Sequence, residues 1–142
     1  MNEIEELLPH REPFLFVDEI LRVDKEGISA RHVFTEGEFF FKGHFPQYPV
    51  VPGVILIETM AQSGGAGLRR LGLPGDGGEG ALFFLASVDK VKFRRQVRPG
   101  EEVRSEIRNL RVSSSSIKQA GKAYVGDELA AEAEWLCLIV RK

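Results

Sequence analysis

A single long helix constrains what this chain can fold into. Residues from Val54 to about Leu71 contain no proline and favour helix, and Pro52 stands near the first turn, where a missing N–H costs little. Positions 54–61 are apolar nearly all round the predicted helix, whereas an amphipathic surface helix would show a polar stripe. We therefore expect protein to wrap this helix on most sides.

Strand-like segments flank the helix on both sides in the sequence. Residues alternate between apolar and polar at 13–23 and 28–36 before it, and at 82–98, 101–112, 115–125 and 128–140 after it. Turn-forming residues separate the strands at Lys25–Gly27, Pro99–Gly100, 113–116 and Gly126–Asp127. This order predicts one α+β domain over residues 1–142, in which a long antiparallel sheet curves around a central buried helix.

Shorter segments complete the chain. The sequence IEELLP predicts a short helix that ends at Pro9. FFFKGHFPQYPVVPG predicts a rigid, non-helical connection, because proline fixes φ and makes the preceding residue extended. The glycine-rich stretch GLPGDGGEG, residues 72–80, predicts a mobile loop after the long helix.

The composition argues against several functional classes. A net charge of −2 gives no reason to expect nucleic acid or an anionic membrane as a partner. No apolar stretch approaches the ~20 residues that span a bilayer, and the N-terminus lacks a signal-peptide pattern, so we expect a cytoplasmic protein. The sequence WLCLIV favours a buried, unreactive Cys137, and we read His10 and His32 as structural. The common nucleotide, zinc-protease and hydrolase motifs do not occur, and a single cysteine offers no Cys-rich metal site.

The stretch HFPQYPVVPG, directly before the predicted helix, contains a candidate base. Three prolines follow His44 at a spacing of three and hold the backbone in one conformation. Histidine is the usual general base near neutral pH. A lone loop histidine is more often structural than catalytic, but the proline frame is a costly way to hold a residue without a task.

One acidic residue interrupts the apolar helix. The nearest neighbours of Glu58 on the helix are Val54, Ile55, Ala61 and Gln62, none of which is a cation. Burial without a cation raises the pKa of a carboxyl group, which would make Glu58 a candidate general acid. Gln62 would hold the carboxyl group by a hydrogen bond. A glutamate that reaches solvent past the end of the helix is an equally good interpretation.

The start of the helix is a candidate binding site for a carbonyl oxygen. The first N–H groups of a helix have no intrahelical partner and carry the positive end of the helix dipole. At Gly53 and Val54 they could stabilise an oxygen that gains negative charge, and glycine allows a ligand to approach the backbone closely. Every helix has such an end, so this signal is weak alone.

The segment KVKFRRQVR carries five cations and no acid: Lys90, Lys92, Arg94, Arg95 and Arg98. In a strand, residues 90, 92 and 94 would share one face. One interpretation is an edge strand whose charges face solvent and discourage pairing with other chains. The other is a docking surface for an acidic carrier or a phosphate.

Three segments closely resemble one known family: LLPHREPFLFVDEI, FKGHFPQYPVVPGVILIETMAQSGG and FLASVDKVKFRRQVRPGE. They are similar to the (3R)-hydroxyacyl-[acyl-carrier-protein] dehydratases of bacterial type II fatty acid synthesis, the Z type, and occur in the family order. The stretches GLPGDGGEG and SSSSIKQAGK depart from the family pattern, and both lie outside the catalytic block.

The resemblance implies a hot-dog fold and assigns roles to the residues above. His44 corresponds to the catalytic histidine, Glu58 to the catalytic acid, and Gly53 to the glycine whose N–H binds the thioester carbonyl. The carbonyl of Val50 is implied to bind the histidine ring or nearby substrate. Glutamate at position 58 favours the Z type over the A type, which has aspartate there.

The resemblance also implies a cofactor-free dehydration and two kinds of partner. One is an acyl carrier protein that bears a 3-hydroxyacyl chain and meets the 90–98 segment. The other is a second copy of the chain, in a dimer that takes His44 from one subunit and Glu58 from the other, commonly within a trimer of dimers. Two alternatives stay open: a hot-dog thioesterase, and a non-catalytic subunit that binds acyl thioesters.

Overall fold

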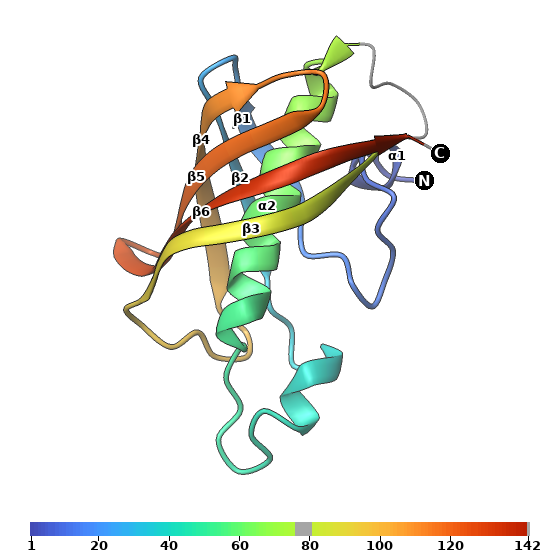
Figure 1. Ribbon diagram of the computed structural model, residues 1–142. Helices are drawn as coiled ribbons and strands as arrows, with labels where there is room; N and C mark the ends of the chain where they lie inside the picture. Colours follow the sequence, from blue (N-terminus) through green and yellow to red (C-terminus); the bar gives the residue numbers. More distant parts are fainter. Residues whose placement is uncertain (76–80, 142) are drawn as a thin grey trace.

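One curved antiparallel sheet wraps around a long helix (Figure 1). The computed structural model describes residues 1–75 and 81–141. Its six strands have the spatial order β1-β2-β4-β5-β6-β3, and neighbouring strands pair antiparallel. The elements are α1 (Glu3–Leu7), β1 (Glu19–Val23), β2 (Gly27–Val33), the 3₁₀ turn η1 (Phe39–Lys42), α2 (Gly53–Arg70), β3 (Ala81–Phe93), β4 (Glu102–Val112), β5 (Ser116–Val125) and β6 (Glu128–Arg141). This is the hot-dog architecture, and the predicted α+β class is confirmed.

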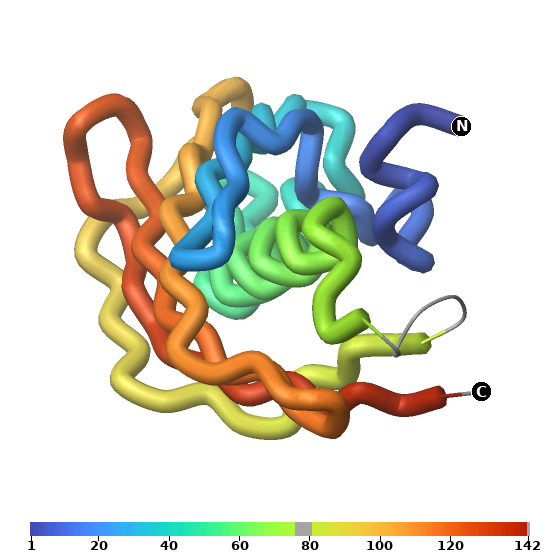
Figure 2. The backbone as a smooth tube through the Cα atoms, turned by 90° about the horizontal axis from the view of Figure 1, so that it is seen from above, coloured from blue at the N-terminus to red at the C-terminus, as the bar shows by residue number. Residues whose placement is uncertain are grey.

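Helix α2 lies inside the curve of the sheet. Figure 2 shows strands β3 to β6 passing around one side of α2, while the N-terminal segment covers another. Most of the helix is buried, but Val54 is 70% exposed, and Glu58 and Ala61 are only partly buried. These three residues lie one above the other on the helix. The helix is therefore wrapped on most sides, as predicted, except along the stripe that carries Glu58.

None of the helices in the described part of the chain is long and apolar enough to cross a lipid bilayer. Helix α2 spans 18 residues, and the glycines, serine and glutamate among them lower its mean hydropathy. Its apolar side chains are covered by the protein's own sheet instead.

The first strand is shorter than predicted. The sequence indicates a strand from residue 13, but β1 begins at Glu19. The side chain of Gln62 binds backbone groups of the stretch before β1. Its Oε1 accepts a hydrogen bond from the Phe16 N–H at 2.8 Å, and its Nε2 donates to the Phe14 carbonyl at 3.2 Å. A side chain therefore joins Phe14 and Phe16 to helix α2, and backbone bonding to the sheet begins with the Asp18 N–H, which donates to the Arg31 carbonyl of β2 at 2.8 Å.

The strand predicted over 82–98 is also too long, because β3 ends at Phe93. The following residues leave the sheet, and the Val97 carbonyl accepts a hydrogen bond from the Val51 N–H at 2.8 Å. Similarly, β2 ends at Val33 and not at residue 36. The other predicted strand ends agree to within one residue.

The connection before α2 was predicted to be non-helical, and that is wrong for Phe39–Lys42, which form the single 3₁₀ turn η1. Phe40 and Phe41 are buried within it, so burial of these rings overrides the extended conformation that the prolines further on favour. The short N-terminal helix is confirmed as α1 and ends before Pro9. Residues 76–80 of the predicted 72–80 loop lie outside the described residues.

The sheet can approach α2 closely because the helix has a glycine at the contact. A Cβ atom on Gly67 would overlap the side chain of Ile28 on β2, which is fully buried. A larger residue would force the helix away from the sheet along its whole length, because both elements are rigid and the core between them is close-packed.

We expect Gly67→Ala to lower the free energy of unfolding by about 2 kcal/mol, because the added methyl group overpacks the contact with Ile28. Gly37→Ala is the matched control, since nothing lies within 4 Å of a Cβ at Gly37. Urea denaturation of both variants measures the difference. Equal stabilities would contradict the close approach of β2 to α2.

Candidate active site

The loop before α2 holds His44 in one orientation. The ring Nδ1 lies 3.1 Å from the Val50 carbonyl, and the Val50 N–H donates back to the His44 carbonyl at 2.9 Å. The ring also stacks on Phe45, with 4.3 Å between ring centroids. A carbonyl can only accept, so the neutral ring carries its proton on Nδ1 and keeps a lone pair on Nε2. His44 is thereby prepared to accept a proton at Nε2.

The helix starts at Gly53 with its first N–H groups open. Pro52 is the N-cap and supplies no side-chain hydrogen bond, while its carbonyl accepts from the N–H groups of Ile55 and Leu56. No acceptor among the described residues takes the N–H groups of Gly53 and Val54. They are the groups that a ligand oxygen can meet.

Glycine is required at position 53 by its surroundings. The ring of Phe93, at the end of β3, lies over it, and a Cβ there would be 2.8 Å from two ring atoms. The ring itself is 53% exposed, so it also forms part of the protein surface beside the helix start. A side chain at position 53 would push this ring away or block the N–H groups.

One cavity brings His44 and the helix start together. Its volume is about 490 Å³, and Val50, Gly53 and Val54 line it with the histidine. The rest of its wall is formed by Val51, Leu56, Phe93, Arg94, Arg95, Gln96 and Val97. Apolar side chains therefore face a base and two free N–H groups, which suits a ligand with an apolar chain and a reactive carbonyl.

Glu58 lies in a different place. It is one and a half turns further along α2 and lines a second cavity of about 50 Å³ with Gln62 and His10. Its Oε2 accepts a hydrogen bond from Gln62 Nε2 at 2.9 Å, as the sequence predicted. The Glu58 side chain is 22% exposed, so it is not enclosed within one chain. The structure thus brings His44, Val50, Gly53 and Val54 together and separates Glu58 and Gln62 from them.

Sequence reasoning did not anticipate that His10 lies beside Glu58, with 3.6 Å between Nε2 and Oε2. The two residues are far apart in the chain, and the signal is weak. His10 stands in LLPHREPF, part of the family-like sequence, and the sequence indicated only a structural histidine there. Only the packing of this segment across α2 makes the contact visible.

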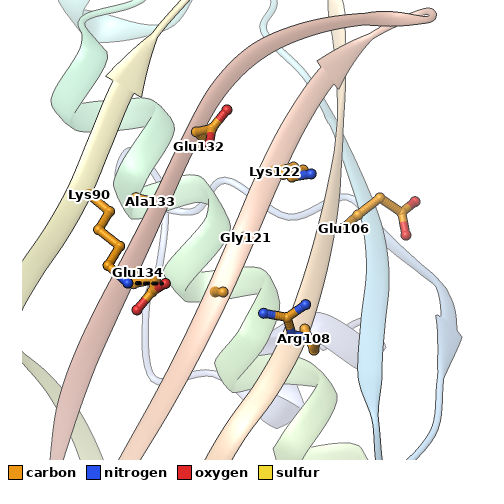
Figure 3. Close-up of a pocket in the computed structure, with 9 residues that line it drawn as sticks. Lys90, Glu106, Arg108, Gly121, Lys122, Glu132, Ala133 and Glu134 are labelled. Carbon is orange, nitrogen blue, oxygen red and sulfur yellow. Dashed lines mark ion pairs between the residues drawn. The ribbon is translucent and has the colours of Figure 1, made fainter.

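Acids on neighbouring strands neutralise most of the 90–98 cations. Lys90 pairs with Glu134 at 3.4 Å and Arg94 with Glu132 at 2.9 Å, and Lys92 lies opposite Glu132. Figure 3 shows Lys90, Glu132 and Glu134 around a shallow hollow on the outer face of the sheet, with Lys122 and Arg108 across it. Because cations and acids alternate there, the hollow carries no single sign of charge.

The remaining two cations differ from each other. Arg95 makes ion pairs with Glu101 at 2.9 Å and with Glu128 at 3.4 Å. Arg98 has no carboxylate at ion-pair distance among the described residues; its guanidinium stacks 4.5 Å from the Tyr48 ring centroid and donates to the Tyr48 hydroxyl. The five residues therefore do not form one uniform basic patch.

A buried histidine anchors the segment that leads to His44. Nδ1 of His32 lies 2.8 Å from Asp18, and Nε2 lies 3.1 Å from Glu38, the residue that precedes η1. Burial alone would lower the pKa of His32, but hydrogen bonds and charge from both carboxylates outweigh burial and raise the pKa to about 9. The protonated ring joins β2 to the stretches before β1 and η1, as expected for a structural histidine.

Several known proteins with similar sequences carry the same name. A family model described as the FabA-like domain matches residues 8–134. The chain is 47% identical to the 3-hydroxyacyl-[acyl-carrier-protein] dehydratase FabZ of Desulforamulus reducens, over 100% of this chain and 98% of that protein. It is 46% identical to the FabZ of Pelotomaculum thermopropionicum over 94% of each chain, and 39% identical to that of Clostridioides difficile over 100% of this chain and 98% of that protein.

Solved structures share the fold at low sequence identity. The dehydratase heterocomplex ApeI:P from Xenorhabdus doucetiae superposes with a TM-score of 0.83 at 16% identity, over 100% of this chain and 93% of that one. A putative thioesterase from Ralstonia eutropha reaches 0.63 at 18% identity, over 84% and 83%. These likenesses support the hot-dog fold alone. From the sequence matches, the chain belongs to the FabA-like family and, within it, to the FabZ group.

The His32 cluster predicts a stability that depends on pH. The folded-state pKa of His32 lies above its unfolded value, so this contribution is complete below about pH 6.5 and is lost as the pH rises through about 9. We expect the free energy of unfolding to fall by about 3 kcal/mol across that window. His32→Gln, which is uncharged throughout, should lack this loss in urea titrations at pH 6 and 9.5. Parallel losses in both proteins would contradict the cluster.

Proposed function

We propose that this protein removes water from a (3R)-3-hydroxyacyl chain on an acyl carrier protein and releases the trans-2-enoyl product. The curated relatives that match over nearly the whole chain bear the name of this activity. The observation that carries the proposal is the cavity in which the free Nε2 of His44 and the open N–H groups of Gly53 and Val54 face one space. A base beside an oxyanion site is what removal of a proton next to a carbonyl requires.

The first half of the reaction uses the His44 cavity. The thioester carbonyl accepts the N–H of Gly53, and the helix dipole stabilises the negative charge that develops on its oxygen. His44 takes the proton from C2 at Nε2, while its Nδ1–H bond to Val50 stabilises the cationic ring that results. Val54 and the apolar wall hold the chain next to the reacting carbons.

The second half of the reaction needs an acid. Glu58 gives a proton to the C3 hydroxyl group, which leaves as water while the C2 electron pair forms the C2–C3 double bond. Gln62 holds the carboxyl group in place through Oε2. Transfer of the proton from His44 back to Glu58, directly or through solvent, restores both groups, so the cycle consumes no other reagent.

The two halves meet across a dimer in this proposal. Within one chain, Glu58 and His44 line different cavities. The exposed apolar side chains Val54, Phe84 and Phe93 lie beside these cavities or on β3, which is an edge of the sheet. Pairing of a second copy there covers these side chains and places Glu58 of the partner subunit at His44. The trimer of dimers and the cytoplasmic location expected from the sequence stay predictions.

The carrier protein meets the mouth of the His44 cavity in this proposal. Arg94 and Arg95 line the cavity but are engaged by acids of the same chain. Arg98 lies beside Tyr48 and is exposed; its guanidinium has no carboxylate at ion-pair distance among the described residues, although Glu101 accepts its backbone N–H at 2.8 Å. We therefore place the main contact with the acidic carrier at Arg98 and assign Lys90 and Lys92 to the outer face of the sheet.

Two inactive variants should restore activity together. His44→Asn keeps an N–H near the Nδ1 position but lacks Nε2, and Glu58→Gln lacks the acidic proton, so each should lose about 10²–10⁴-fold in kcat. If each site takes His44 and Glu58 from different chains, an equal mixture refolded together regains about a quarter of wild-type activity, because half of the dimers contain one intact site. Formation of the enoyl thioester, followed by its absorbance, measures this.

Three outcomes separate the possibilities. No recovery in the mixture, with both single variants inactive, places His44 and Glu58 of one chain in the same site. Full activity in either single variant overturns that residue's assignment. Release of free thiol from the 3-hydroxyacyl thioester without enoyl formation identifies a thioesterase, and tight binding with neither product identifies a binding subunit.

The docking assignment gives a separate prediction. Arg98→Ala should raise KM for the carrier-bound substrate about fivefold at low salt and leave KM for a short pantetheine thioester unchanged, because only the carrier supplies the acidic surface. Lys90→Ala is the matched control, since it removes one cation from the outer face, and should alter neither KM. Equal effects of the two variants would contradict a specific contact at Arg98.

A further inference from the structure

His10 lines the Glu58 cavity, and the proposed reaction gives it no role. Its Nε2 lies 3.6 Å from Oε2 of Glu58, and its side chain is 28% exposed. Its Nδ1 is buried and has no hydrogen-bond partner among the described residues. The two side chains share the small cavity with Leu8, Gln62 and Cys137. A polar ring in this position is either a passive part of the wall or acts on the carboxyl group beside it.

The segment that carries His10 is held firmly across α2. The Arg11 guanidinium donates to the carbonyls of Leu8 at 2.8 Å and His10 at 2.6 Å, which closes the turn on which the histidine stands. Further along, the Gln62 side chain bonds the backbone of Phe14 and Phe16. His10 therefore faces Glu58 because of fixed backbone on both sides of it.

Two nitrogen atoms converge on one oxygen of Glu58. Gln62 Nε2 donates to Oε2 at 2.9 Å, and His10 Nε2 faces the same atom. No hydrogen bond from the described residues takes Oε1. A carboxyl group that is held at Oε2 from two directions presents its Oε1 in one orientation. Donors on Oε2 also stabilise the negative charge that remains after Oε1 has given up its proton.

The surroundings favour a neutral ring that donates from Nε2. Burial lowers the pKa of His10, the charge of Glu58 opposes this, and Arg11 lowers the pKa further. Cys137 of β6 lines the same cavity, and burial raises the pKa of its thiol to about 12, so it adds no charge. A neutral imidazole has one N–H; on Nε2 it gives Glu58 a donor and leaves only a lone pair at the unpartnered Nδ1.

We propose that His10 is a positioning residue for Glu58: with Gln62 it holds Oε2, so that Oε1 delivers the proton to the departing hydroxyl group. This rests on the proposed function, in which Glu58 is the acid. The 3.6 Å separation is longer than a hydrogen bond, and the proposal requires it to shorten in the complex with substrate. His10 does not itself touch the substrate.

The test compares two amides at this position. His10→Gln places an N–H near the Nε2 position, whereas His10→Asn places one near Nδ1, too short to reach Glu58. We expect His10→Asn to lower kcat about tenfold with little change in KM, as for loss of a hydrogen bond to a charged group, and His10→Gln to restore most of it. Thermal unfolding of both variants is the control, and we expect equal melting temperatures.

The pH profile of kcat distinguishes positioning from a structural role. Loss of a donor makes the carboxylate less stable, so the basic limb should move to higher pH in His10→Asn. The acidic limb should stay in place. In addition, His10→Asn should have no further effect in the Glu58→Gln background, because it acts through Glu58.

The outcomes separate this proposal from the proposed function. If Glu58→Gln is inactive but His10→Asn and His10→Gln have equal kcat and an unmoved basic limb, the role of His10 is overturned and that of Glu58 stands. If His10→Asn reduces activity as much in the Glu58→Gln background as in the wild type, His10 acts independently of Glu58. If Glu58→Gln keeps full dehydratase activity, both assignments fail.

Discussion

Burial of α2 inside the curved sheet is the interaction on which the rest of this structure depends. The helix buries most of its length against β2 to β6, so its position is set by the close-packed core and not by its own helical preference. Gly67 lets β2 approach at Ile28, which fixes the distance between the two layers. Because the helix cannot shift, each residue on it has a defined place relative to the surrounding loops.

The same helix carries both parts of the candidate site. Its open start at Gly53 faces the cavity of His44, while its uncovered stripe presents Glu58 to a different surface. An acid on the apolar helix is tolerated because that stripe is not enclosed within the chain and because Gln62 provides a hydrogen bond. The arrangement leaves the base and the acid of one chain apart, which is why a second copy completes the site in the proposed mechanism.

Charge is distributed by the cross-strand pairs of the sheet. On the outer face, Lys90 and Arg94 meet acids of β6, so a segment that is strongly basic in the sequence is close to neutral in space. Arg98 lies beyond the end of β3, and its guanidinium makes no ion pair among the described residues. Inside the fold, the protonated His32 balances two carboxylates and secures the approach to His44.

The sequence by itself determined the fold class and the helix, and it singled out His44, Gly53 and Glu58 as candidate site residues. These follow from local signals: the proline frame, the proline-free apolar run, the alternation of the strands, and three segments with a specific family pattern. The strand ends were less predictable. In the stretch before β1, the Gln62 side chain competes with the sheet for the backbone groups of Phe14 and Phe16.

Only the tertiary structure decided which of these residues meet. The contact of His10 with Glu58, the neutralisation of Lys90 and Arg94, and the separation of the two cavities all join segments that are distant in the chain. The periodicity of apolar residues in the sequence indicates on which face of a helix or strand a side chain lies. Its partner on that face depends on the strand order and on the path of the N-terminal segment. Those are properties of the packed chain, and no local pattern contains them.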